Sequence, residues 1–264
     1  MTREYKNRIV CFVDVLGFRA LIDRASDEES GLAIIEILES ALSSDLIAPI
    51  EGDATLVGDA RQSIRMFSDC VCISAPDTFG GLLVVLARLA TAQNKLARKG
   101  ILLRGAISSG RHYESEAMIF SQGLVSSYLM ESKIAVFPRV IISKTLLARH
   151  MSGTMVKQKE ILGGVWIATD FDDQPFVNYF PSVKAEGPKL VALRESLVQH
   201  RDMIVRERES QKDKPDVMHK IGWVRRYHNF VCQRSLPSDA DLLIGSTRHD
   251  GFARWKNQEA QPQR

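Results

Sequence analysis

The stretch that most constrains the fold is residues 9–18, IVCFVDVLGF. Five of its first six residues are apolar, which predicts a buried strand rather than an amphipathic one. Asp14 interrupts this run, and a carboxylate at the end of a buried strand is costly unless a cation pairs with it. Gly17 allows a tight turn and a close approach of the backbone to a ligand. The stretch therefore predicts a strand end that could hold a metal and a phosphate.

Composition sets the broad class of the protein. The 264 residues suffice for one large domain or one domain with an appendage, and 45% apolar with 25% charged residues is typical of globular proteins. The net charge of +3 does not suggest a nucleic-acid partner. The polar N-terminus shows no signal peptide, and no apolar run approaches the ~20 residues that span a membrane. The four cysteines lack zinc-type spacing, so we expect reduced thiols in a cytoplasmic protein.

The first 150 residues alternate strands and helices. Apolar spacing predicts the order β-α-β-β-α-β-β-α-β, an α+β fold whose sheet carries helices on one face. After the first strand, the expected elements are a helix at 28–47, a loop at 49–59, a hairpin at 62–75, a helix at 79–98, strands at 101–108 and 117–120, a helix at 121–135 and a strand at 138–143.

The remainder of the chain changes character. Apolar runs at 165–168 and 175–180 predict a hairpin, and helices are expected at 187–210 and 216–233. The last 25 residues are polar and unpatterned, which is typical of a flexible tail. We therefore expect a main domain at 1–150, a hairpin and helical extension at 151–240 and a polar tail at 241–264.

Two strand-end carboxylates, Asp14 and Asp69, are the candidate chemistry. In a β-α-β-β start the first strand lies beside a strand of the hairpin, so the hairpin turn could bring Asp69 towards Asp14. Converging carboxylates repel unless divalent cations lie between them, and two Mg²⁺ or Mn²⁺ ions could polarise a phosphate. Alternatively, Asp14 caps a turn and Asp69 occupies a hairpin tip. The residues alone slightly favour this second alternative, because aspartates are common turn residues.

Four blocks of sequence resemble the motifs of class III nucleotidyl cyclases. Each block is weak alone, but they follow one another in the cyclase order over residues 8–144, which makes the set more specific. The blocks are FVDVLGF at 12–18, which resembles the metal motif F-x-D-I-x-G-F; Ser68-Asp69 within its hairpin, which resembles the second metal aspartate; LRGAISSG at 103–110, which resembles R-x-G-I-x-x-G; and residues 120–131, which stand where cyclases carry F-G-x-x-V-N-x-A-x-R-x-E.

The departures from the cyclase pattern concern the nucleotide. Val125 stands where cyclases place the asparagine that orients the ribose, and Leu129 stands where they place the transition-state arginine. Arg65 replaces the base-reading lysine, and Met118 lies near the second purine-reading position. The resemblance therefore implies a retained metal site with altered base and ribose determinants.

This pattern resembles the pyrimidine cyclases of bacterial anti-phage Pycsar systems. The points of likeness are the short motif Asp-Val-Leu-Gly-Phe, the Phe-Ser-Asp hairpin, Ser127-Tyr128 ahead of Pro138-Arg139-Val140, and Trp223 with Tyr227-His228-Asn229. The resemblance implies that UTP, or less favourably CTP, is converted to a 3′,5′-cyclic nucleotide and pyrophosphate. The product, cyclic UMP, would act on a separate cyclic-nucleotide-binding effector as an antiviral second messenger.

The resemblance also assigns roles to individual residues. Asp14 and Asp69, helped by the Val15 carbonyl, would hold two Mg²⁺ or Mn²⁺ ions. The amides of Leu16, Gly17 and Phe18 would hold phosphates, because a turn entering a helix presents free N–H groups. Arg65 would donate to the uracil edge, since arginine offers donors and no acceptor. The charge of the missing transition-state arginine would come from one of four residues: Arg104, Arg111, Lys133 or Arg139. Arg104 is the candidate catalytic residue among them.

The resemblance implies a homodimer, because class III cyclases build each site from two chains and this chain carries one set of motifs. Two other functions stay open. The chain could be a catalytically silent cyclase-fold module that binds nucleotide, as Val125 and Leu129 suggest, or a two-metal hydrolase that gives a linear product.

Overall fold

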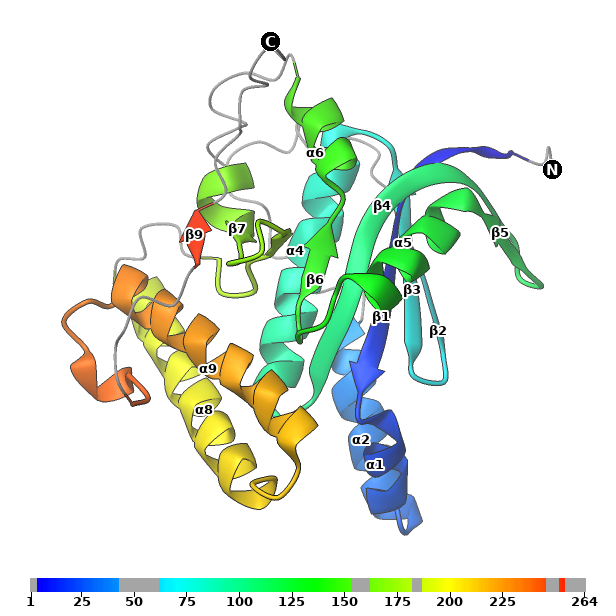
Figure 1. Ribbon diagram of the computed structural model, residues 1–264. Helices are drawn as coiled ribbons and strands as arrows, with labels where there is room; N and C mark the ends of the chain where they lie inside the picture. Colours follow the sequence, from blue (N-terminus) through cyan, green and yellow to red (C-terminus); the bar gives the residue numbers. More distant parts are fainter. Residues whose placement is uncertain (1–3, 43–61, 153–161, 182–186, 246–251, 255–264) are drawn as a thin grey trace.

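The computed structural model describes residues 4–42, 62–152, 162–181, 187–245 and 252–254. The expected loop at 49–59 and the end of the helix expected at 28–47 lie outside these residues. Figure 1 shows the course of the chain, with the strands crossing the molecule and two long C-terminal helices packed beside them.

The first part of the chain forms a split β-α-β pattern. Its elements are β1 (Lys6–Leu16), α1 (Phe18–Arg24), α2 (Glu28–Leu42), β2 (Ser63–Phe67), β3 (Cys70–Pro76), α4 (Phe79–Arg98) and β4 (Leu102–Glu114). The strands lie in the order β2-β3-β1-β4, and all three neighbouring pairs are antiparallel. This is the strand order of a ferredoxin-like sheet, so the expected α+β class is confirmed. β1, whose middle is wholly apolar, lies at the centre.

The sheet continues beyond β4. The elements are β5 (Ile119–Ser121), α5 (Gln122–Lys133), β6 (Val140–Ile142), α6 (Lys144–Met151), a short π-helix at Leu162–Trp166, β7 (Ile167–Thr169), β8 (Pro175–Val177) and β9 (Ala253–Arg254). β6 is parallel to β4, and the β7–β8 hairpin joins through the antiparallel pair β6–β8, so the expected C-terminal hairpin extends the same sheet.

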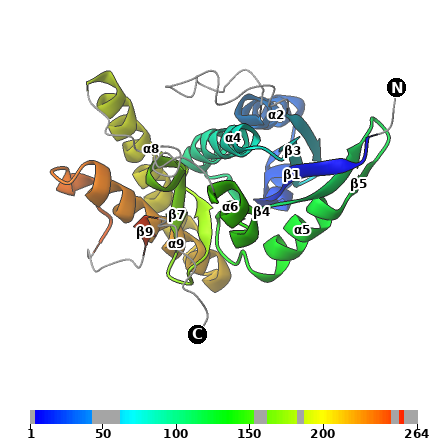
Figure 2. The same cartoon turned by 90° about the horizontal axis from the view of Figure 1, so that it is seen from above.

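Helices lie on both faces of the sheet. Alternate residues of β1, such as Cys11 and Val13, belong to one hydrophobic cluster with α4, which buries most of its length. The residues between them face α5: the ring of Phe12 meets the ring of Tyr128 edge-on at 5.5 Å. Figure 2 shows α2 and α4 on one side of the strands and α5 on the other. The sequence predicted helices on one face of the sheet only. α2 and α4 share one face as predicted, but α5 lies on the opposite face.

A pair of glycines lets α5 lie directly on the strands. A Cβ atom on Gly110 would stand 2.7 Å from the backbone nitrogen of Gly123, and one on Gly123 would stand 2.8 Å from Val10 Cγ2. Ser127 then donates from Oγ to the carbonyl of Val10 at 2.8 Å. This close contact fixes where the side chains of α5 meet the sheet.

The C-terminal helices pack onto the same core. α8 (Pro188–Ser210) and α9 (Pro215–Ser235) end close to their predicted limits. Trp223 and Tyr227 of α9 are fully buried, and Tyr227 donates from its hydroxyl to Asn178 Oδ1 at 2.6 Å. One hydrophobic cluster contains residues from both sides of the domain boundary expected at 150. The C-terminal region is therefore packed onto the first 150 residues.

Part of the segment expected as a flexible tail is packed in the described structure. A short 3₁₀ turn spans Ala240–Leu242, Leu242 is buried, and Ile244 donates from its amide to Asn229 Oδ1 at 2.9 Å. Within the described ranges, no helix combines the length and apolarity that crossing a bilayer requires.

Candidate metal site

The hairpin between β2 and β3 delivers Asp69 to the end of β1. Phe67 pairs with Cys70, so the turn holds only Ser68 and Asp69, and Ser68 adopts a left-handed φ of 55°. The carbonyl of Asp69 accepts a hydrogen bond from the amide of Val15 at 2.8 Å. This bond ties the turn to the residue that follows Asp14. The two aspartates therefore converge, as the first of the two alternatives drawn from the sequence proposed.

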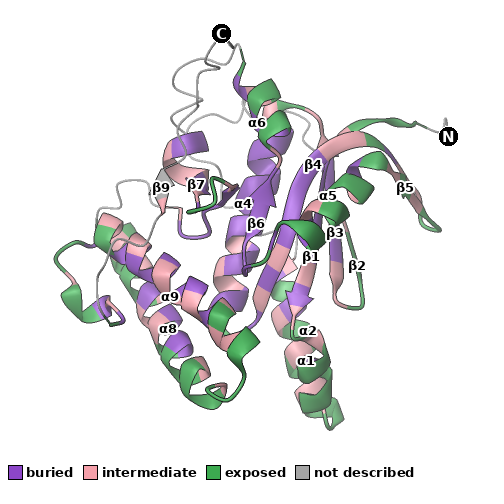
Figure 3. Ribbon diagram, viewed as in Figure 1, coloured by how far each residue is buried: buried purple, intermediate pink, exposed green. Residues whose placement is uncertain are grey.

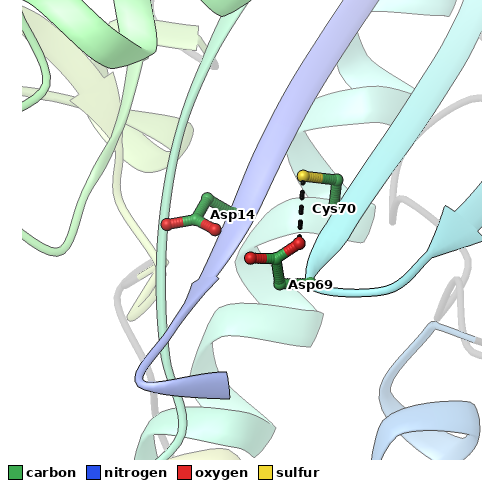
Figure 4. A group of neighbouring side chains, drawn as sticks. All are labelled: Asp14, Asp69 and Cys70. Atoms are coloured by element: carbon green, nitrogen blue, oxygen red, sulfur yellow. Dashed lines mark hydrogen bonds between the residues drawn. The ribbon is translucent and has the colours of Figure 1, made fainter. Parts of the chain in front are cut away.

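The side chains of Asp14, Asp69 and Cys70 form one cluster. Each offers one ligand atom, and these atoms lie within 4.8 Å of one another. Figure 4 shows Asp14 on β1 and Asp69 at the foot of β3, with the Cys70 thiol above the Asp69 carboxylate. The thiol donates to Asp69 Oδ1 at 3.5 Å, and burial, together with that bond, raises the pKa of Cys70 to about 12. At neutral pH it is a protonated thiol beside two carboxylates.

Arg104 completes the row of side chains on the other side of β1. Asp14 pairs with Cys70 on β3 and with Arg104 on β4, so the three side chains share one face. The guanidinium lies 3.5 Å from Asp14 Oδ2 and 2.5 Å from Oε1 of Glu131, a buried residue of α5. Arg104 is therefore held mainly by Glu131, with Asp14 as its second partner.

The surroundings of this strand end disfavour the charged form of Asp14. Two carboxylates, those of Asp14 and Glu131, share the Arg104 guanidinium, and the Asp69 carboxylate lies beside Asp14. Burial raises the pKa of Asp14, and the Asp69 carboxylate adds to the rise, while Arg104 and Lys220 of α9 oppose it. Burial likewise raises the pKa of Glu131 against the opposing pull of Arg104. A cation between the aspartates would relieve this repulsion.

The donor set fits a hard divalent cation. Asp14 and Asp69 offer carboxylate oxygens, the ligands that Mg²⁺ and Mn²⁺ take in proteins. Both side chains are partly exposed, so a cation could keep water or substrate oxygens as further ligands. Val15 contributes only backbone, because its side chain is 2% exposed and packs into the core.

The turn after β1 has the shape expected of it. Gly17 has φ 75° and ψ 22° and precedes α1, whose start carries no side-chain cap. Nothing lies within 4 Å of a Cβ built on Gly17, so the demand for glycine comes from the left-handed backbone and not from crowding. Leu16 and Phe18 flank this turn at the open end of the sheet.

Arg65 lies on the same face but outside the carboxylate cluster. It pairs with Cys72 on β3, two residues along from Cys70. Its Nε donates to Glu114 Oε1 at 3.0 Å, within a polar groove of about 860 Å³. Burial favours the neutral carboxyl of Glu114, but hydrogen bonds from Ser63, Arg65 and His112 outweigh it and lower the pKa. The expected base-reading cation therefore stands beside an acceptor.

The other candidates for the transition-state charge form no ion pair with Asp14 or Asp69 among the described residues. Arg139 is fully buried and pairs with Asp170 and Asp172. Arg111 lies 5.8 Å from the centre of the Tyr5 ring, and Lys133 is exposed in the last turn of α5. Of the four candidates, Arg104 is the one that lies beside Asp14. Val125 and Leu129 are exposed on α5, at 58% and 42%.

Sequence reasoning missed the two outer charges of the site. Glu131 could have been found from its place in the fourth motif. Lys220 has no local signal, because its charge reaches Asp14 from a helix that the chain forms about two hundred residues later.

No family model matches this chain, and no curated protein matches it. Among solved structures, it is similar to an adenylate/guanylate cyclase/hydrolase from Silicibacter pomeroyi, at 16% identity and a TM-score of 0.39 over 58% of this chain and 84% of that one. It is also similar to the catalytic core of a rhodopsin-guanylyl cyclase with converted specificity in complex with ATPαS, at 14% identity and a TM-score of 0.39 over 66% and 96%. Likeness at this level carries no weight for function, which is inferred below from the site and the motifs.

Proposed function

We propose that this protein is a nucleotidyl cyclase that converts a nucleoside triphosphate to its 3′,5′-cyclic nucleotide and pyrophosphate. The observation that carries the proposal is the pair of carboxylates, Asp14 and Asp69, which β1 and the β2–β3 turn bring within 4.8 Å. The resemblance of four ordered motifs to class III cyclases supports it, because both aspartates stand at the metal positions of those motifs.

The residues divide the work as follows. Two Mg²⁺ or Mn²⁺ ions, when bound, would lower the pKa of the ribose 3′-hydroxyl and polarise the α-phosphate. Asp14 and Asp69 would hold these ions, with the Val15 carbonyl as a further ligand. The backbone from Leu16 to Phe18 would receive phosphate oxygens at the left-handed turn.

In the reaction, the 3′-oxygen forms a bond to the α-phosphorus and loses its proton to solvent. The bond between the α-phosphorus and the bridging oxygen to the β-phosphate breaks, so pyrophosphate leaves. Arg104 lies where it could face charge that develops on the α-phosphate. Its pairing with Glu131 keeps the guanidinium in place on the open face.

The proposed substrate is a pyrimidine triphosphate, UTP before CTP. Arg65 would donate to a uracil carbonyl, and the absence of an aspartate at Met118 disfavours a purine. Glu114 beside Arg65 adds an acceptor, which would suit the amino group of cytosine. The likeness to Pycsar cyclases suggests a role in anti-phage signalling, with cyclic UMP acting on a separate effector.

The test is an assay of the purified chain with each of the four nucleoside triphosphates and Mn²⁺. We expect pyrophosphate and a cyclic product, most from UTP, and at least a thousandfold loss in Asp14→Ala and Asp69→Ala. Asp216→Asn is the matched control, because Asp216 is an exposed carboxylate in the first turn of α9. Full activity in either aspartate variant would contradict the two-metal proposal, and preference for ATP or GTP would contradict the pyrimidine assignment.

A silent nucleotide-binding module is the second candidate. The exposure of Val125 and Leu129, where a ribose-orienting and a transition-state group are expected, favours it. Such a module would bind a triphosphate with Mn²⁺ and return it unchanged. A linear product would instead indicate the hydrolase.

A further inference from the structure

A cavity of about 380 Å³ lies between the first turn of the chain and the C-terminal helices. Leu16 and Gly17 line it on one side, and α8 and α9 line it on the other. Figure 1 shows the start of α9 approaching the beginning of β4, next to the point where β1 runs into α1. The cavity is thus continuous with the turn that follows Asp14. Core residues such as Leu21, Ile204 and Ile221 line part of it, and it shares no lining residue with the groove around Arg65.

Lys220 is the residue that connects this cavity to the metal site. It lies on α9, lines the cavity together with Gly17, and its positive charge acts on Asp14. Within the described part of the chain, no carboxylate or other acceptor forms an ion pair or hydrogen bond with its ammonium group. Lys220 is half-buried, and several apolar residues share its wall of the cavity, including Val217, Ile221 and Val224.

Because no ion pair or hydrogen bond of the described residues occupies this ammonium group, an anion in the cavity could pair with it. The charges that line the cavity leave room for such an anion: Asp23 and Glu207 are acidic, whereas Arg24, Lys214 and Lys220 are basic. Glu207 already has a partner in Arg206, 3.5 Å away. An anion that extends from the metal site past Gly17 would meet the ammonium group of Lys220.

We propose that Lys220 binds the β- and γ-phosphates of the nucleotide, so that the C-terminal helix α9 supplies part of the substrate site. This inference rests on the proposed function for the identity of the nucleotide, but it requires only that a polyphosphate binds beside Gly17. Lys220 would stabilise pyrophosphate as it leaves, because negative charge builds on the β-phosphate in the transition state. This role would give the C-terminal helices a function in the site, since they position this lysine.

The test is calorimetric titration of the full chain with inorganic tripolyphosphate in the presence of Mn²⁺. In Lys220→Ala we expect affinity to fall about tenfold, the loss of one charge-assisted contact, and Lys220→Arg should restore part of it. Lys212→Ala is the matched control: Lys212 is 62% exposed just before α9 and pairs with Glu209. The difference between wild type and Lys220→Ala should shrink as salt rises.

Thermal unfolding shows whether Lys220→Ala is folded. We expect a midpoint close to that of the wild type, because the substitution removes no ion pair or hydrogen bond of the described residues and only the attraction between Lys220 and Asp14 is lost. Tripolyphosphate affinity within twofold of the wild type in folded Lys220→Ala, or a wild type that binds no tripolyphosphate, would overturn the inference. The cyclase assay on the wild type decides the proposed function separately. A chain that binds tripolyphosphate through Lys220 but forms no cyclic product would retain this inference and lose the cyclase.

Discussion

Asp14 illustrates how a residue that suits a metal can burden the metal-free protein. Burial and the neighbouring Asp69 carboxylate both favour the neutral form of Asp14. Arg104 favours the charged form, but its guanidinium is shared with Glu131. The same arrangement preserves a negative site that a divalent cation can fill. Function and stability therefore oppose each other at this residue.

We predict that Asp14→Asn leaves the thermal midpoint of the metal-free chain at pH 7 unchanged or raises it. The pKa of Asp14 is raised in the folded state, so ionisation costs stability as pH rises through that pKa. The advantage of asparagine should thus be absent in acid and appear towards neutral pH. Differential scanning calorimetry across this pH range is the measurement, and a midpoint several degrees lower at pH 7 would contradict the prediction.

The same variant should lose the stabilisation that Mn²⁺ gives. A ligand at one hundred times its dissociation constant stabilises the native state by about 2.7 kcal/mol, and Asp14→Asn should forfeit most of this. Asp216→Asn should keep it. A Mn²⁺-dependent shift of wild-type size in Asp14→Asn would show that the cation binds elsewhere.

Sequence could predict the inner part of this site but not its surroundings. Asp14 and Asp69 could be identified from the sequence because each stands at the end of an apolar strand. The short hairpin turn then fixes where Asp69 lies. The burial of Arg139 could not be predicted from the sequence, because its partners Asp170 and Asp172 lie on a turn about thirty residues away. Long-range pairing of this kind leaves no mark in the local pattern.

At the scale of elements, helices with a wide apolar stripe were the most predictable. α4 spans the residues that its apolar spacing indicates, since nearly all of its sides are buried. α5 was found as a helix, but its place on the opposite face was not expected. Only a few of its residues are buried, and the glycine contact that docks it depends on the partner strand.

A buried histidine pair joins α8 to α9 and the segment that follows. His200 Nδ1 and His228 Nδ1 are 3.1 Å apart, and His228 Nε2 lies 2.9 Å from the carbonyl of Leu242. If His228 donates to Leu242, His200 can donate to His228 and accept from the Tyr179 hydroxyl at 3.4 Å. Each ring is then neutral, with one donor and one acceptor. Protonation of either ring would interrupt this series of hydrogen bonds.

We predict that this pair makes the fold sensitive to acid. Burial lowers the pKa of His228 to about 4 and that of His200 well below its usual value, with His228 adding to the latter shift. Between about pH 6.5 and pH 4 the unfolded chain binds protons that the folded chain does not. Stability should therefore fall as pH falls, by up to about 1.4 kcal/mol per pH unit for each histidine.

Urea unfolding at several pH values measures this slope. His228→Gln should flatten it, whatever its effect on stability at pH 7, because the substituted side chain does not titrate. His219→Gln, an exposed position on the same helix, should leave the slope unchanged. An equal slope in the wild type and His228→Gln would remove the histidine pair as the cause.

At the scale of the whole molecule, α5 lies on the face of the sheet that carries the carboxylates. α5 and the strand before it expose large apolar side chains outward, as the exposed side of α5 in Figure 3 illustrates. The exposed residues are Phe120 at 60%, Val125 at 58%, Tyr128 at 51% and Leu129 at 42%. Exposed apolar groups gathered beside a site are typical of an interface.

We predict that the chain forms a homodimer through this surface of α5, with the two sheets' open faces opposed. A symmetric pair would give two equivalent sites, each next to residues of the other chain. Val125→Arg should then yield monomers in light scattering at the assay concentration and lose most of the cyclase activity, because a charge would be buried in the interface. Val191→Arg is the matched control, since Val191 on α8 is also 58% exposed. A wild type that is monomeric and fully active at that concentration would contradict the dimer, and equal effects of the two substitutions would exclude α5 as its interface.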